Sequence, residues 1–136
     1  MLKIAKSVEY SILAIKYINE NNSRGSLTAR EIADNENIPY DLLAKILQKL
    51  VRNGIIKSVQ GNKGGYLIDV SLSKLFITDL IAAVDQNIQL TDCMVENPTI
   101  NDCARYENCC IKDPLKKVQN KINEVLKSTT LMEIIE

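Results

Sequence analysis

The chain has 136 residues, of which 46% are hydrophobic and 25% are charged, and its net charge is zero. This composition is ordinary for a soluble globular chain, and the length suits one domain or a small domain with an appendage. No apolar run approaches the ~20 residues of a membrane span, so we expect no membrane partner. The N-terminal stretch lacks the apolar segment and cleavage site of a signal peptide, so we expect a cytoplasmic protein.

The charges are unevenly distributed along the chain. Residues 1–70 carry ten Lys and Arg against seven Asp and Glu, whereas residues 71–136 carry seven against ten. Between Pro39 and Tyr66, five basic residues stand against Asp41 alone. A local basic patch on a neutral protein is what contact with phosphates requires, although a solvated helix face can have the same composition.

The N-terminal region predicts two helices separated by a loop. Apolar residues recur at helical spacing from about Ala5 to Glu20, which predicts the first helix. Thr28 stands three residues before Glu31, in the spacing of a capping box, and therefore predicts the start of the second helix. We expect this short helix to end near Asn35.

A third, strongly periodic helix is expected to begin with Pro39 at its first position and to end at Gly54 in a left-handed cap. Residues 55–59 and 66–70 then predict two strands joined by the glycine-rich stretch QGNKGG. Three helices followed by a hairpin indicate a winged helix-turn-helix, with the hairpin as the wing and Lys63 at its tip.

The rest of the chain predicts further helices on either side of a polar loop. FITDLIAAVD indicates a fourth helix capped by Thr78, and Asp113 is expected to cap a long helix after the loop. That helix carries a coiled-coil-like stripe: Leu115, Val118, Ile122 and Val125. We expect it to form a homodimer, with packing against its own domain as the alternative. The tail is expected to form a short helix that docks on the domain.

The chain resembles the IscR/NsrR group of winged-helix regulators in the Rrf2 family. The resemblance covers nearly the whole chain and includes EYSILAIKYI, ILQKLVRNGIIKSVQGNKGGYLI, FITDLIAAVD, the spaced cysteines and the closing TLMEI. It implies a homodimeric transcription factor, often a repressor, that binds a palindromic operator in double-stranded DNA. Such regulators are often switched by an iron–sulfur cluster.

The predicted fold class is mainly α with a small β-hairpin: a winged helix-turn-helix domain plus a long C-terminal dimerisation helix. We expect four segments along the chain. They are a DNA-binding domain at residues 1–85, a cysteine-rich cluster-binding loop at 86–112, a dimerisation helix at 113–128 and a docking segment at 129–136.

The helix-turn-helix geometry predicts which side chains meet DNA. We expect the exposed start of the third helix to face base edges with Tyr40, Asp41 and Lys45. Four residues are expected to contact phosphates: Thr28, Arg30, Lys49 and Lys63. The resembled family usually has Arg-Gly at the start of the wing, where this chain has Gln60-Gly61, so we expect its operator or its affinity to differ.

All four cysteines lie between residues 93 and 110, and the chain has no histidine. The C-x-x-C spacing that is commonest in zinc sites is absent. Because adjacent Cys109 and Cys110 point in different directions in most backbones, we expect three thiolates to act together. The resemblance implies that Cys93, Cys103 and Cys109 hold a 2Fe–2S or 4Fe–4S cluster, with Cys110 as the alternate to Cys109.

A cluster held by three thiolates needs a fourth ligand. The resemblance points to Glu9, because members of the family place a ligand at this position of the opening helix. The alternative interpretation of Glu9 is an ordinary surface carboxylate. For the cysteines, the alternatives are thiol–disulfide sensing, a zinc site and reduced thiols without a role.

Three functions fit these observations. The first is a regulator, expected to be a repressor, that senses iron–sulfur, redox or nitric oxide status through the cluster. The second is a repressor of the same fold without a cluster, controlled by thiol oxidation, a metabolite or a partner protein. The third is a winged-helix module that binds proteins. We expect neither an enzyme nor a small-molecule substrate, because the chain lacks histidine, a phosphate loop and a nucleophile motif.

Overall fold

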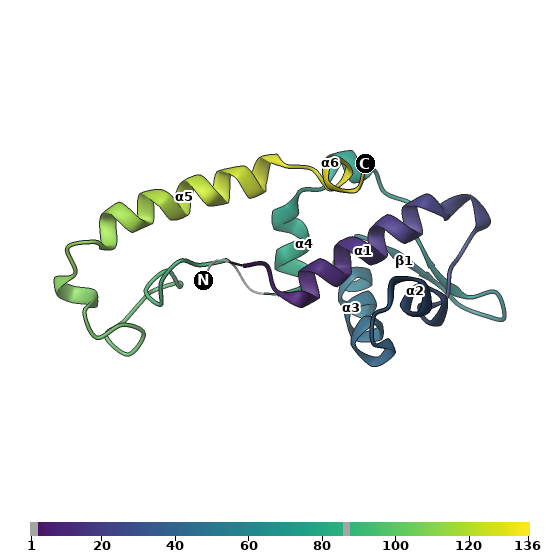
Figure 1. Cartoon of the computed structure of the whole chain (residues 1–136), viewed down its shortest axis with the longest axis horizontal. Coiled ribbons are helices and arrows are strands. Elements are labelled where there is room, and N and C mark those ends of the chain that lie inside the picture. Colours follow the sequence, from purple (N-terminus) through teal and green to yellow (C-terminus); the bar gives the residue numbers. More distant parts are fainter. Residues whose placement is uncertain (1–2, 86–87) are drawn as a thin grey trace.

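The computed structural model describes residues 3–85 and 88–136 and has an elongated shape (Figure 1). A compact winged-helix part lies at one end, and a long helix runs away from it above the loop that carries the cysteines (Figure 1). The described residues are mainly helical, with one two-stranded antiparallel hairpin, so the predicted fold class is confirmed. None of their helices is both long and apolar enough to cross a membrane.

The helices and strands follow the predicted order. In chain order they are α1 (Lys6–Glu20), η1 (Asn22–Arg24), α2 (Ala29–Glu36), α3 (Tyr40–Arg52), β1 (Lys57–Val59), β2 (Gly65–Leu67), η2 (Leu72–Lys74), α4 (Ile77–Val84), η3 (Tyr106–Asn108), α5 (Lys112–Ser128) and α6 (Leu131–Ile135), where η marks a short 3₁₀ helix. The two strands are shorter than predicted, because Ile68 bonds through its backbone to the Asn22 side chain instead of to β1.

The start of α2 is capped as predicted, but only in one direction. The Thr28 hydroxyl accepts a hydrogen bond from the backbone N–H of Glu31 at 3.1 Å. A complete capping box also needs the Glu31 carboxylate to bond back to the Thr28 backbone. In this structure that carboxylate accepts hydrogen bonds from Tyr17 and Arg24 instead.

Two predicted helix caps are wrong. Helix α4 begins after Phe76, whose backbone N–H donates to the Asp79 carboxylate at 2.8 Å, so Thr78 lies inside the first turn. Helix α5 begins after Ile111, so Asp113 also lies inside a first turn rather than at the cap. In α4 the Asp79 carboxylate acts from within the first turn, whereas α5 has no side-chain hydrogen bond at its N-cap residue, Ile111.

Helix α3 is strongly amphipathic and ends in the predicted way. Leu43, Ile46, Leu47 and Leu50 are buried along one face. The helix ends at Arg52, and Gly54 follows the C-cap residue with a φ of 71° in the left-handed region. The backbone N–H of Ile55 donates to the carbonyl of Leu50 at 3.0 Å. This arrangement is the expected glycine-dependent termination, and it turns the chain into the hairpin. Pro39 precedes α3 as its N-cap residue, one position before the predicted one.

A single hydrophobic core joins α1, α2, α3, α4 and the C-terminal helix α6. The tail docks as predicted: Leu131 and Ile135 are buried, and the backbone N–H of Leu131 donates to the carbonyl of Leu75 at 2.8 Å. The predicted segment boundary lies between Asp85, which the structure describes, and residue 86, which is outside the described residues, and the division into four functional segments stays a prediction.

Candidate functional site

The eight predicted DNA contacts all lie on the surface of the winged-helix part. The exposed residues are Thr28, Arg30, Tyr40, Asp41, Lys45, Lys49, Gln60 and Lys63. The starts of α2 and α3 are in contact here, because the Arg30 guanidinium lies 4.0 Å from the centre of the Tyr40 ring. Such a stacked cation stays partly available to a phosphate while the aromatic ring keeps it in place.

The outer face of α3 carries more polar groups than the predicted set. Asp41 and Lys45 are followed along the same face by Gln48 and Arg52, which are also exposed. Gln48 and Arg52 border a hollow of about 300 Å³ against the hairpin, together with Gln60. The helical period that places the buried residues of α3 on one face also places Gln48 and Arg52 on the opposite, exposed face. The predicted DNA contacts omit these two residues.

Lys49 has a different position from Lys45. Its ammonium donates to the carbonyl of Val84 at the end of α4, at 3.5 Å. It therefore lies on the flank of α3 that packs against α4, where it meets the negative end of the α4 dipole. A phosphate contact by Lys49 stays a prediction, whereas its contact with α4 is part of the fold.

The wing is attached to the start of α2 through backbone contacts. Leu27 and Tyr66 exchange two backbone hydrogen bonds of 2.9 and 2.7 Å, and the Ser26 hydroxyl donates to the carbonyl of Lys63. Gly65 allows this approach, since a Cβ at its position would lie 2.3 Å from the carbonyl oxygen of Leu27. The hairpin that carries Gln60 and Lys63 is thereby held next to the helix-turn-helix.

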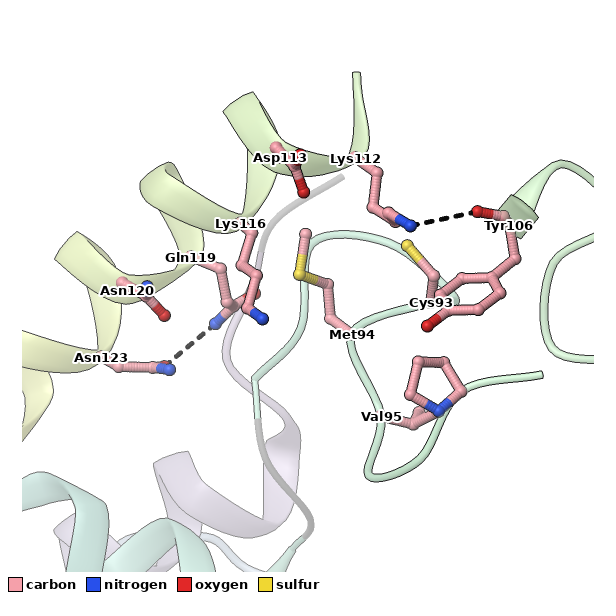
Figure 2. Close-up of a pocket in the computed structure, with 11 residues that line it drawn as sticks. Cys93, Met94, Val95, Tyr106, Lys112, Asp113, Lys116, Gln119, Asn120 and Asn123 are labelled. Atoms are coloured by element: carbon pink, nitrogen blue, oxygen red, sulfur yellow. Dashed lines mark hydrogen bonds between the residues drawn. The ribbon is translucent and has the colours of Figure 1, made fainter. Parts of the chain in front are cut away.

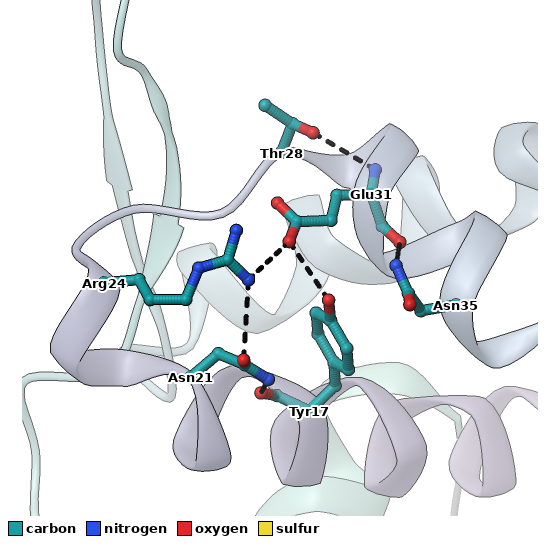
Figure 3. Close-up of polar contacts among 6 residues, drawn as sticks. All are labelled: Tyr17, Asn21, Arg24, Thr28, Glu31 and Asn35. Carbon is teal, nitrogen blue, oxygen red and sulfur yellow. Dashed lines mark hydrogen bonds and ion pairs between the residues drawn. The ribbon is translucent and has the colours of Figure 1, made fainter.

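A polar network holds α1 and α2 together beneath this surface (Figure 3). The Glu31 carboxylate accepts hydrogen bonds from the Tyr17 hydroxyl at 3.0 Å and from the Arg24 guanidinium at 2.7 Å. Burial raises the pKa of Tyr17, and donation to Glu31 raises it further. The hydrogen bond to Glu31 likewise raises the pKa of Arg24. The network fixes the angle at which α2 enters the motif.

The cysteine loop is irregular apart from one turn of 3₁₀ helix, and its four thiols are free. Cys93, Cys103 and Cys109 are half-buried, and Cys110 is exposed. The Cys93 sulfur lies 3.1 Å from the Thr91 hydroxyl. In residues 3–85 and 88–136, no three Cys, Asp or Glu side chains are grouped closely enough to hold a metal ion.

Glu9 lies on α1 and is not grouped with the cysteines. Its carboxylate forms a 2.7 Å ion pair with Lys6, and its side chain is 45% exposed. That hydrogen bond raises the pKa of Lys6. Within one chain the structure therefore gives Glu9 the surface environment that was the alternative to ligation, and a role as fourth ligand stays a prediction.

The buried side chain that ties the loop to α5 is Gln119, which the sequence prediction does not include. It is 6% exposed, accepts a hydrogen bond from the backbone N–H of Leu90 and donates one to the carbonyl of Ile88, both at 2.8 Å. On the neighbouring stripe of α5, Val118 is 47% and Val125 is 61% exposed among the described residues, whereas Leu115 and Ile122 are half-buried. A glutamine on a largely polar helix gives no sequence signal of burial.

Comparison with known proteins relates this arrangement to regulators of transcription. A family model named Rrf2 and described as iron-dependent transcriptional regulator matches residues 4–136. The regulator IscR of Xenorhabdus nematophila is 22% identical over 135 residues, which cover 99% of this chain and 80% of the relative.

Solved structures have the same fold. CymR, the global cysteine regulator of B. subtilis, superposes with a TM-score of 0.73 at 21% identity and covers 99% of this chain and 97% of its own. T. potens IscR gives a TM-score of 0.73 at 22% identity over 98% of this chain and 86% of its own. Since the family model spans nearly the entire sequence, the chain belongs to the Rrf2 family of transcriptional regulators.

Proposed function

We propose that this chain is a homodimeric repressor that binds a palindromic operator and senses iron–sulfur, redox or nitric oxide status through a cluster in its cysteine loop. The observation that carries the proposal is the placement of all four thiols, free, in the irregular segment between the winged-helix part and α5. Cysteine is most often buried as a small hydrophobic residue, so four thiols in a polar loop favour a chemical role.

The exposed face of α3 and the attached wing support DNA binding. The polar face of α3 can enter a major groove and consists of Asp41, Lys45, Gln48 and Arg52. Gln60 borders the hollow between this face and the wing. Arg30 and Lys63 are placed outside this face, as groups that contact phosphates are. In a dimer, two such faces would be separated by about one DNA turn, ~34 Å.

The uncovered stripe of α5 supports the homodimer. Val118 and Val125 are aliphatic and largely exposed, and a second α5 would remove them from water. We expect the Val118→Asp and Val125→Asp double variant to be monomeric by light scattering and to lose operator binding, while its circular dichroism keeps the helical content. A dimer that survives both substitutions would exclude this stripe as the interface.

The donor set of the loop fits an iron–sulfur cluster in its chemistry. Cys93, Cys103 and Cys109 would hold the cluster, with Cys110 as the alternate and Glu9 as the fourth ligand. When bound, the cluster supplies a link that oxidation or nitric oxide can break. Because the described residues do not group three donors, the loop has to close around the cluster, and its ends lie next to α4 and α5. Closure would then change the positions of α4 and α5.

The direct test is purification without oxygen, followed by measurement of visible absorption, iron and acid-labile sulfide. We expect brown protein that contains both elements, and colourless protein after Cys103→Ala. Cys110→Ala serves as the matched control at the exposed thiol and is expected to keep the colour. If Cys110→Ala alone abolished the cluster while Cys109→Ala kept it, the assignment of the ligands would be wrong.

A repressor without a cluster is the second candidate, and one observation favours it. The described residues contain no group of three Cys, Asp or Glu side chains that could hold a metal ion, and the structural neighbour CymR is named as a global cysteine regulator. In that case thiol oxidation, a metabolite or a partner protein controls DNA binding. Colourless, iron-free protein that still shifts operator DNA would favour this candidate.

A further inference from the structure

A pocket of about 430 Å³ lies between the first part of the cysteine loop and α5 (Figure 2). Its volume falls within the range of about 300–1,000 Å³ that small-molecule sites occupy. One wall comes from the loop and is mainly apolar, with Met94, Val95 and the Tyr106 ring. The opposite wall is the polar face of α5.

The α5 wall presents cationic and amide groups. Lys112 and Lys116 are one turn apart on this wall, and Asp113 is the one acidic residue of the lining. Lys112 is already engaged, because its ammonium donates to the carbonyl of Tyr106 at 3.3 Å and lies 4.4 Å from the centre of that ring. Lys116 makes no hydrogen bond or ion pair with the described residues and has its charge available for a ligand.

Two of the amides around Lys116, those of Gln119 and Asn123, are held by hydrogen bonds. Gln119 is buried and bonds both to the start of the loop and to the Asn123 side-chain oxygen, which accepts its hydrogen bond at 3.0 Å. This leaves the Asn123 NH2 group without a hydrogen bond to the described residues, and Asn123 lines the pocket together with Asn120 (Figure 2). A site built before its ligand arrives loses less entropy on binding.

We propose that the cluster-free protein binds a small organic carboxylate in this pocket. Lys116 and the Asn123 amide bind the carboxylate, and the apolar part of the ligand packs against Met94 and Tyr106. The proposal rests on the proposed function in one respect: the pocket belongs to the sensor loop. Because Cys93 lines it as well, an occupied pocket keeps Cys93 in the cluster-free arrangement and opposes assembly of the cluster.

The test uses the full chain after removal of iron with a chelator, titrated in a calorimeter with succinate and with phenylacetate. Succinamide and phenylacetamide are the uncharged controls of matching shape. We expect at least one acid to bind at a single site per chain and both amides to give no binding. Amides that bind as well as the acids, or acids that give no binding, would overturn the proposal.

Two variants separate this site from general charge attraction. Lys116→Gln is expected to weaken the binding of the acid by about 10-fold, because it removes a charge-assisted hydrogen bond. Lys117→Gln removes the same charge from the next residue of α5, outside the pocket, and is expected to leave binding unchanged. Equal weakening in both variants would reject the site. Since the titration needs no cluster, failure of the cluster proposal would leave its outcome intact.

Discussion

The winged-helix part and the part formed by the cysteine loop with α5 are stabilised differently. Every buried hydrophobic side chain in the described residues lies between Val8 and Val84 or in the docked tail. From residue 88 to residue 128, the buried side chain is the polar Gln119. The winged-helix part therefore has its own core, whereas the cysteine loop and α5 are held by hydrogen bonds and a few turns.

This difference has a consequence for regulation. A segment with few buried apolar contacts rearranges at a small cost in free energy, and a ligand or a second chain can select its conformation. A segment with a close-packed core keeps its shape and transmits the change as a movement of whole elements. Under the proposed function, residues 88–128 would rearrange on sensing, and residues 3–85 would present a constant surface to the operator.

The largest expected effect comes from truncating a buried side chain of the winged-helix part, compared with truncating an exposed side chain of α5. Leu47→Ala should lower the free energy of unfolding by about 2–5 kcal/mol, because Leu47 is fully buried in α3 and a cavity remains. Val118→Ala on the uncovered stripe of α5 should change the intrinsic stability of a monomer far less. Urea unfolding of both variants at low protein concentration checks the comparison, and equal losses would break it.

The wing allows a test of the close backbone contact between the hairpin and Leu27 in the winged-helix part. Gly65→Ala should cost about 1–3 kcal/mol of stability, because its new Cβ would collide with the Leu27 carbonyl. Lys63→Ala in the same hairpin is exposed and should stay within about 0.5 kcal/mol of the parent. Thermal unfolding distinguishes the two. A tolerated alanine at Gly65 would mean that the wing is not held against α2 in this way.

The network between α1 and α2 predicts a dependence on alkaline pH. Tyr17→Phe should lose about 1 kcal/mol of stability, since it removes the hydrogen bond to Glu31. The pKa of Tyr17 is raised above its ordinary value of 10.0, so its stabilising contribution is complete below pH 10. It decreases as the pH rises through the folded pKa. The stability difference between parent and variant, measured by urea unfolding, should therefore shrink above pH 10; a constant difference would argue against the bond.

The smallest expected effect concerns the affinity for DNA. Gln60→Arg should tighten operator binding a few-fold in low salt, because arginine suits the negative potential of a narrow minor groove and glutamine is neutral. The gain should shrink as salt rises, since phosphates and their counterions dominate the salt dependence. Fluorescence anisotropy at two salt concentrations measures it. A folded variant with no gain in low salt would remove Gln60 from the interface.

The helices of the winged-helix part could be predicted from local sequence signals. The Thr28 cap, the buried stripe of α3 and the left-handed Gly54 each depend on neighbouring residues alone, and the structure has all three. The Phe76 cap is equally local, but phenylalanine has no side-chain oxygen of the kind that identifies an N-cap in a sequence, whereas the nearby Thr78 does.

The arrangement of the cysteine loop and α5 depends on contacts between residues that are distant in the sequence. The sequence pattern therefore predicts less of this arrangement than of the winged-helix part. The burial of Gln119 follows from backbone groups about 30 positions earlier in the chain, and these leave no local signature. The flank position of Lys49 likewise depends on α4, which lies 35 residues further along the chain. The family resemblance implies Cys93, Cys103 and Cys109 as candidate ligands, but a sequence pattern cannot give the distances between their sulfur atoms.

The most direct test of the account is the affinity for operator DNA, measured on one anaerobic preparation before and after removal of the cluster. A sensor that controls the winged-helix part should change this affinity at least 5-fold, the lower end of typical coupling between sites. The Cys103→Ala variant should match the cluster-free protein. Equal affinities with and without the cluster would contradict the claim that the cysteine loop controls DNA binding.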